Sequence, residues 1–520
     1  MKRQVKIQIA FIIVLMAIIF PAYSQVKLSI KKADYAKGKV VNGSLLNILT
    51  GNVVMLHDDA TIYCDSAVFY DESNRVEAFG RVRIVDTNTT ISSNRASYTG
   101  DSKIAALRGN VVFRQTDGIT LYTEKLDYNR GNGLAKYFDG GKLVDGVNVL
   151  NSVRGYYNEH SRIASFGKDV RGKNPDWSLT SDTLQYNTNT KVMNFTGPTT
   201  LVDNNQKSAK YETGFYNTIT KRSSLRSGEF ETPNYFLQGN QIELNDQTQY
   251  YTATEDVFMI SKDDNVIISG EKAIYDKAHG RIKVFQNALL KRVLSEGDTL
   301  YLRADTLMSV EQEDAEKDIL YAYKNVSVYK SDFQGIADSI VYSSKDSLMY
   351  FYQDPVLWTE GSQLTSDTMR MVMKNGVMDE LVMSSNSFII SKDKLNQYNQ
   401  IKGRVMVTKF KDEEISRVNV SGNGESIYFV IDEEKGKLTG MNKVICSNML
   451  IRFLNNNVNR ITFYVNPDGD FYPPHEIKEE NAYLNGFSWR EQEKPSREYV
   501  LRLEELKVLE TPTKTKKIQE

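Results

Sequence analysis

The sequence is poor in cysteine, histidine, tryptophan and proline, and these shortages argue against particular kinds of structure and site. Two cysteines, Cys64 and Cys446, far apart in 520 residues, do not make a disulfide framework, and we expect free thiols. The four histidines have no partner at a metal-ligand interval, and there is no Cys-x₂-Cys pair, so we expect no metal site and no cofactor. A net charge of −1 gives no general attraction to nucleic acid.

Long hydrophobic runs are also scarce, and the single strong one lies at the N-terminus. The run from Ile9 to Phe20 follows a basic leader and would span only about 18 Å as a helix, short of a ~30 Å hydrocarbon core. Small residues at the positions before Gln25 predict a signal peptide over residues 1–24, cleaved before Gln25. A retained anchor is the alternative. We expect an exported protein that is periplasmic and associated with the outer membrane.

Aromatic residues, in contrast, are abundant, with 30 Tyr and 22 Phe, and many fall in a repeated strand motif. Six clear copies and five weaker ones recur at a period of about 30 residues. The first, third and fifth residues of each copy share a parity and would point to one face of a strand, which is apolar and aromatic. The clear copies start at Asp65, Asn94, Glu124, Asp182, Glu271 and Asp338.

A half-period near 15 residues predicts two strand-and-turn segments in each repeat. Between strands we find no amphipathic helix of crossover length, which excludes a parallel βαβ sheet. Two all-β architectures fit this repeat length: a parallel β-solenoid, and an antiparallel sheet folded into a trough. The inward tyrosine favours the trough, because its hydroxyl must reach a partner or water.

These repeats resemble the OstA-like family of lipopolysaccharide-transport proteins. The segment Leu179–Tyr186, followed by an Asn-containing turn and an aromatic-Gly pair, is typical of that family, and the resemblance covers roughly residues 30–380. It implies an elongated antiparallel β-jellyroll, or β-taco. It also implies binding of lipid A acyl chains in the trough, and head-to-tail contact with other OstA-like transport proteins. The chain is longer than a single soluble bridge protein, and we expect 25–383 to form the repeat jellyroll and 384–490 a C-terminal OstA-like β region.

We expect the inward side chains to line a groove that binds lipopolysaccharide. The plainer interpretation is that they form only a core. Basic residues such as Arg75, Arg81, Arg108 and Arg114 would meet lipid phosphates if they lie near the groove mouth, or act only as solubility features. The predicted lining residues are Ala67, Phe69, Val82, Ala96, Tyr98, Val111, Leu126, Tyr128, Leu184 and Tyr186.

Three functional classes follow from these patterns. The first is a non-enzymatic bridge that also contacts an outer-membrane translocon, or further copies of itself, by adding strands at its open sheet edges. The others are a secreted β-solenoid that cleaves polysaccharide, and a lipid-free adhesin or scaffold. Over residues 491–520 we expect a short helix, Ser496 to Leu509, and a disordered tail.

Overall fold

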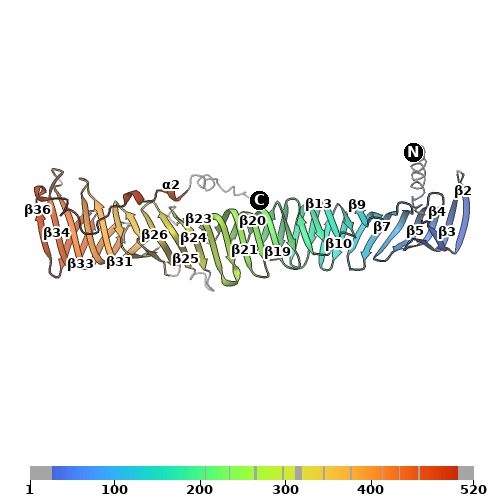
Figure 1. The fold of residues 1–520 in the computed structure, drawn as a ribbon, viewed down its shortest axis with the longest axis horizontal. Helices are drawn as coiled ribbons and strands as arrows, with labels where there is room; N and C mark the ends of the chain where they lie inside the picture. The colour runs from blue at the N-terminus through green and yellow to red at the C-terminus, as the bar shows by residue number, and fades with distance from the viewer. Residues whose placement is uncertain are drawn as a thin grey trace, which may run out of the picture. The chain divides into compact units, whose positions relative to one another are not determined.

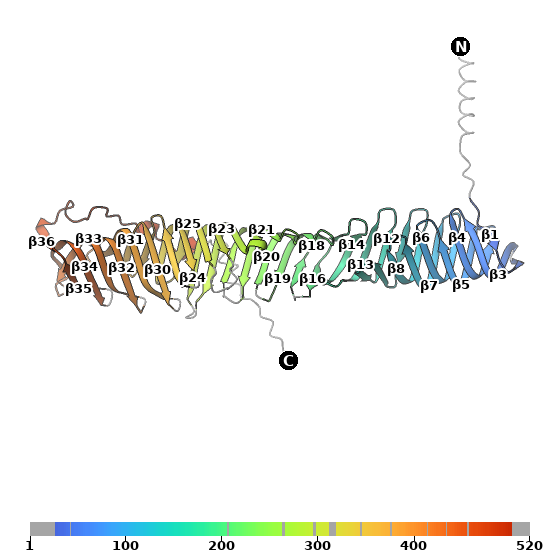
Figure 2. The same cartoon turned by 90° about the horizontal axis from the view of Figure 1, so that it is seen from below.

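A computed structural model describes residues 26–501, apart from short gaps at 42, 205–206, 234, 263–265, 295–297, 311–318, 344–345, 375–376, 413, 433 and 455–456. The predicted signal peptide and tail lie outside these residues. The chain divides into two compact units, residues 1–204 (unit 1) and 205–520 (unit 2). Both are built from antiparallel strands that lie side by side (Figures 1 and 2), which confirms the predicted all-β class. Residue 383, where the sequence suggested a boundary, lies inside the strand Val377–Lys392.

The described residues of unit 1 form sixteen strands joined by short turns. They are β1 (Ser29–Lys32), β2 (Tyr35–Val41), β3 (Ser44–His57), β4 (Ala60–Tyr70), β5 (Arg75–Val85), β6 (Thr89–Thr99), β7 (Ile104–Gln115), β8 (Thr120–Asn129), β9 (Leu134–Tyr137), β10 (Gly141–Asp145), β11 (Asn148–Ser152), β12 (Arg154–Asn158), β13 (Ile163–Lys173), β14 (Trp177–Asn187), β15 (Val192–Phe195) and β16 (Thr199–Asp203).

Unit 2 continues the pattern with longer strands toward its C-terminal end. They are β17 (Ser208–Tyr211), β18 (Thr213–Asn217), β19 (Arg222–Glu231), β20 (Tyr235–Asn245), β21 (Tyr250–Ser261), β22 (Val266–Asp276), β23 (Arg281–Val293), β24 (Thr299–Val310), β25 (Ile319–Tyr329), β26 (Phe333–Ser343), β27 (Leu348–Tyr352), β28 (Val356–Thr359), β29 (Ser362–Thr365), β30 (Thr368–Lys374), β31 (Val377–Lys392), β32 (Tyr398–Lys411), β33 (Glu414–Asp432), β34 (Lys437–Leu454), β35 (Asn457–Tyr464) and β36 (Asp468–Tyr472).

Most long strands are bent in the middle, and the bends divide each unit into two walls. At each bend the pairing register shifts, as between Tyr63 and Ser66 of β4, and the buried parity changes with it. We call the half-strands on the two sides of the bends wall A and wall B. In unit 1, wall A comprises the half-strands within residues 53–64, 82–93, 111–123, 141–152, 170–181 and 199–203, and wall B those within 44–50, 66–79, 95–108, 125–137, 154–167 and 183–195. In unit 2, wall A includes the half-strands within 228–238, 257–270, 288–304, 326–337, 356–365, 387–403 and 424–446, and wall B those within 241–254, 272–285, 306–323, 339–352, 368–384 and 405–421.

A glycine forms the bend in several strands of unit 1. Gly80 has φ +73° and is followed by Arg81 at φ 43°, both in the left-handed region that favours glycine. An ideal Cβ on Gly80 would lie 2.4 Å from Oδ2 of Asp65, the acid that opens the repeat motif, and Arg81 donates to the same carboxylate. Asp65, the motif acid, therefore binds the bend of the neighbouring strand and not a metal or a substrate.

A C-terminal segment, residues 473–501, runs back along unit 2 after β36 (Figure 1), and we call it the strap. It contains η3 (Pro474–Glu476), η4 (Glu491–Glu493) and the one-turn helix α2 (Arg497–Val500), so the expected short helix is present. The helix ends at Val500, because Leu501 has extended backbone angles (φ −92°, ψ 114°), so it is shorter than the expected Ser496 to Leu509. Residues 502–520 lie outside the described part. The helix contacts β24 and β25.

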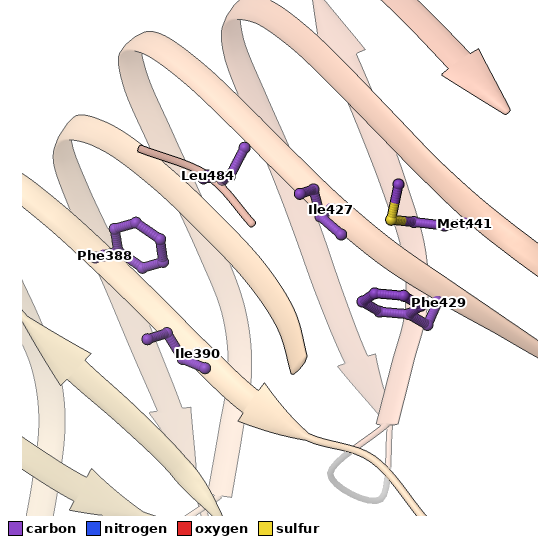
Figure 3. Packing of buried hydrophobic residues seen from close by; sticks show 6 residues of the cluster. All are labelled: Phe388, Ile390, Ile427, Phe429, Met441 and Leu484. Carbon is purple, nitrogen blue, oxygen red and sulfur yellow. The ribbon is translucent and has the colours of Figure 1, made fainter. Parts of the chain in front are cut away.

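The strap packs on wall A of unit 2, which is why both faces of that wall are buried there. Leu484 packs among Phe388, Ile390, Ile427 and Phe429 (Figure 3). Near the other end of the strap, the side chains of Val500 and Leu501 cover Leu289 and Tyr301.

Two fully buried glutamines of wall A bind the strap through its backbone. The amide of Gln400 donates to Ala482 O over 2.9 Å and accepts from Leu484 N over 2.8 Å. The amide of Gln363 makes the same pair of bonds, to Ser488 O at 2.7 Å and from Arg490 N at 2.6 Å. Because each glutamine satisfies both of its polar groups on the strap, the strap is an integral layer of unit 2.

Candidate functional site

The interior face of unit 1 is a row of tyrosines that alternate with alanines along wall B. The cross-strand register places Tyr98 beside Ala105, which is beside Tyr128, and the alternation continues to Tyr186. Each small alanine leaves room for the rings on the neighbouring strands. The row is Tyr98, Ala105, Tyr128, Ala135, Tyr157, Ala164 and Tyr186, and every member is at most 1% exposed.

All ten side chains predicted to line a groove point to this interior and are buried, with exposures between 0% and 6%. Eight of them lie in wall B, while Val82 and Val111 lie in wall A. The two walls touch, because Phe113 of wall A meets Tyr128 of wall B edge-on, with ring centroids 5.5 Å apart. The lining residues are thus brought together, but in a closed interior. Their contact with lipid stays a prediction.

Each tyrosine hydroxyl of the row is satisfied near the ends of the walls. Tyr98 O–H lies 2.8 Å from Nδ1 of His57 in wall A, and Nε2 of that ring is 2.8 Å from Val26 O. The carbonyl can only accept, so Nε2 carries the hydrogen and Nδ1 accepts from the tyrosine. Burial raises the pKa of Tyr98 and of Tyr157, which keeps both hydroxyls protonated.

Glu159 connects the two walls near their ends, beside the tyrosine hydroxyls. One of its carboxylate oxygens accepts from Tyr128 O–H at 2.9 Å, and the other accepts from Thr89 and from Gln115 of wall A. Burial, with the negative charge of Glu159 next in importance, raises the pKa of Tyr128 far above its usual range. Glu159 itself lies in a turn of wall B, so its bonds to Thr89 and Gln115 hold the two walls together above the apolar interior.

The outer ends of the two walls are closed by ion pairs between turns of wall B and turns of wall A, a row that we call the latch. Arg130 is only 7% exposed and pairs with Asp59 and Asp86. Lys103, bonded to Asp58 over 2.8 Å, holds the pKa of that carboxyl below its usual range. The remaining pairs are Arg162 with Asp117 at 2.6 Å and Lys191 with Asp145 at 2.5 Å.

The latch was not identified from the sequence, and the basic residues that were considered lie elsewhere. Arg81 is at a bend with an 85% exposed side chain, Arg75 pairs with Glu77 on its own strand, and Arg114 is exposed on wall A. A signal was nevertheless present: a basic residue closes the turn five positions after the motif tyrosine, as in Tyr186 and Lys191.

In unit 2 the corresponding interior is less covered between β20 and β23. The row near the ends of wall B consists of Leu244, Tyr251, Tyr275 and Ile282, aligned by the strand register. All four are half-buried, whereas their counterparts in unit 1 are covered. Residues nearer the bends, such as Ile242, are buried. The stretch is therefore a trough with a closed floor and accessible apolar sides.

The opposite side of this trough is also apolar and half-buried. In wall A the aligned residues are Leu237, Met259 and Ile268, beside Leu290. The ion pair between Lys262 and Glu231, at 2.9 Å, joins two residues of wall A and does not cross to wall B. Together the two walls offer hydrocarbon contacts on both sides, the environment that an acyl chain requires.

A separate hollow of about 680 Å³ lies outside the trough, on wall B of unit 2. Its lining includes the stacked pair Tyr321 and Tyr323 and also Tyr352, which stacks on Tyr350. Two carboxylates are present, but Asp354 binds Arg490 and Asp367 accepts from Asn386. The hollow has aromatic faces without a carboxylate pair set up for acid–base chemistry.

Three further features bear on function. Among the described residues, no group of His, Cys, Asp or Glu side chains is placed to hold a metal ion. In the same part of the chain, no helix has the length and hydrophobicity needed to cross a bilayer. Cys64 and Cys446 are both buried free thiols, and burial raises the pKa of Cys64 to about 11, so it is unreactive.

Comparison with known proteins finds a matching family model and similar solved structures. A family model described as "OstA-like protein" matches residues 25–182, which confirms the resemblance. A solved structure of LptH from Pseudomonas aeruginosa, described as the LptA homologous periplasmic component of the conserved lipopolysaccharide transport device, is 13% identical. The match covers 22% of this chain and 79% of that chain with a TM-score of 0.20, too low to carry an argument. No curated protein sequence matches.

Proposed function

Because residues 25–182 belong to the OstA-like family, we propose that the chain is a non-enzymatic periplasmic bridge that carries lipopolysaccharide toward the outer membrane. The observation that supports this proposal most is the apolar interior between walls A and B. It is closed in unit 1 and less covered between β20 and β23 of unit 2. Export through a signal peptide cleaved before Gln25 belongs to the same proposal.

Any lipid carrier must keep hydrocarbon chains away from water, and an apolar interior provides the space for them. Exposing one CH₂ group costs about 0.8 kcal/mol, so a chain of a dozen carbons costs on the order of 10 kcal/mol. Contacts with Leu244, Met259 and Ile268 on the two sides of the trough would remove most of that cost. We place the first acyl contacts in this less covered stretch of unit 2, because it accepts a chain without a prior opening step.

In unit 1 the ten predicted lining residues would receive the chains once the latch has opened. Tyr98, Tyr128 and Tyr186 lie directly beneath the latch, so a chain that entered there would take the place of the contacts between the walls. In this proposal, unit 1 binds lipid only after the latch has opened, whereas unit 2 binds lipid without such an opening.

Unpaired sheet edges supply contacts for neighbouring proteins. Strand β2 pairs with β3 on one side only among the described pairings, and all seven of its residues are exposed. In unit 2, β35 and β36 both pair with β34, leaving Tyr464 and Phe471 about half exposed. We propose that other OstA-like proteins, a translocon or a second copy add strands at these edges.

Mass spectrometry of the protein purified in mild detergent from its own cell envelope tests the proposal. Bound lipid A species at a fixed stoichiometry are expected. A folded protein free of lipid, in cells that continue to deliver newly made lipopolysaccharide after its depletion, would contradict it. Cleavage of an acidic glycan by that preparation would favour the polysaccharide-cleaving alternative, for which the tyrosine hollow of unit 2 is the available aromatic surface.

A further inference from the structure

The latch of unit 1 is a row of cations placed over an apolar interior. Lys103, Arg130, Arg162 and Lys191 come from successive turns of wall B, and each is now paired with an aspartate of a wall A turn. The row recurs with the repeat, so the cations lie along the length of the closed interior. A ligand that has hydrocarbon tails and several negative charges would match both the apolar interior and the row of cations above it.

The backbone of these turns places the basic side chains at the ends of wall B. Lys103, Arg162 and Lys191 have φ values of 54°, 59° and 59°, a conformation shared with other turn residues such as Asn74 and Gln249. What distinguishes the latch is therefore the pairing of its cations with aspartates of wall A, not the backbone conformation.

We propose that the latch is a binding row for the phosphate groups of the transported lipid, which replace the aspartates when unit 1 opens. This inference rests on the proposed function and adds to it the headgroup chemistry that unit 1 recognises. A phosphate carries more negative charge than a carboxylate and has three acceptor oxygens, and arginine binds it through two parallel bonds. The exchange therefore leaves no cation unpaired.

The latch aspartates differ in exposure: Asp58, Asp86 and Asp145 are 23%, 14% and 12% exposed, whereas two others are partly in water already and can leave first. Asp59 and Asp117 have side chains that are 61% and 41% exposed, so release returns each of them to solvent. Beneath the latch, the same movement frees Tyr98, Tyr157 and Tyr186 from their partners across the interior, which makes room for the tails. Phosphate binding and entry of the tails are thus coupled in one opening.

Equilibrium binding of two radiolabelled lipids to the full chain tests the inference: lipid A with its phosphates, and the same lipid after phosphatase treatment. Arg162→Gln is compared with Arg171→Gln, an exposed arginine on the same strand, β13. We expect Arg162→Gln to weaken binding of the phosphorylated lipid about tenfold and to leave the dephosphorylated lipid unchanged or tighter, since a weaker latch opens more often. Arg171→Gln should change neither.

Asp117→Asn provides the opposite change, because it frees Arg162 from its carboxylate, and should tighten binding of the phosphorylated lipid. Equal weakening of both lipids by Arg162→Gln, or no effect from either latch substitution, would overturn the inference. In those outcomes wild-type protein still binds lipid and the proposed function stands. If wild-type protein binds neither lipid, the proposed function itself fails.

Discussion

Arg130 and Arg81 each pair with aspartate, but Arg130 is buried and Arg81 is exposed. Replacing each of them by methionine therefore distinguishes the latch from an ordinary surface ion pair. Arg130 is 7% exposed and bonds Asp59, Asp86 and Tyr98 O–H. Arg81 is 85% exposed and pairs with Asp65. Methionine keeps most of the length of each side chain, so the change removes charge and hydrogen bonds rather than volume.

For Arg130→Met we expect unit 1 to lose about 3 kcal/mol of stability. Breaking a buried ion pair costs roughly 3–5 kcal/mol, because the remaining charge stays uncompensated. The lower end applies here, since Asp59 is 61% exposed and regains water, while Asp86 at 14% does not. For Arg81→Met we expect no measurable loss, because an exposed pair is already solvated.

Hydrogen exchange of the backbone amides of β6 to β8, followed by mass spectrometry, gives the free energy of opening in unit 1 without interference from unit 2. The loss for Arg130→Met should appear in both walls, since Arg130 joins them, whereas Arg81→Met should leave exchange in both walls unchanged. Equal effects of the two substitutions would refute the idea that the latch closes unit 1.

The remaining predictions concern the bend, the strap and the tyrosine row. Gly80→Ala should cost about 2 kcal/mol, since it adds a clash with Asp65 to the strain of a positive φ, while Gly146→Ala, with open space around it, should cost about 1 kcal/mol in urea unfolding. Gln400→Leu should speed amide exchange at Leu484 and its neighbours in the strap; unchanged protection there would show that the glutamine does not hold it. Burial raises the pKa of Tyr137 to about 12, so its stabilising effect is complete below pH 10 and is lost between pH 10 and 12, by about 1.4 kcal/mol per pH unit. Tyr137→Phe should lessen the alkaline loss of stability by that amount, and an unchanged pH profile would contradict the cause given.

The inward face was predictable from the sequence because it depends on local parity alone. A strand places alternate residues on one face whatever its partners are, and the motif Asp65 to Phe69 recurs often enough to reveal that alternation. The tyrosine also indicated a trough, since its hydroxyl needed a partner, and His57, Glu159 and Asp145 supply one.

The latch and the strap were not predictable in the same way, because both depend on contacts between distant segments. Lys191 and Asp145 are brought together only when two walls fold against each other across a bend. The bends also shift parity by one residue, which moved Arg81 away from the expected groove mouth. The run from Phe388 to Ile390 is buried on both faces only because Leu484 returns to cover one of them.

The central claim is that hydrocarbon chains bind between walls A and B, and photo-crosslinking in living cells tests it most directly. A photoreactive residue at Ile268, on the half-buried inner side of β22, should capture lipopolysaccharide. The same residue at Lys272, exposed on that strand, should capture none. Capture at Lys272 with none at Ile268 would contradict the account.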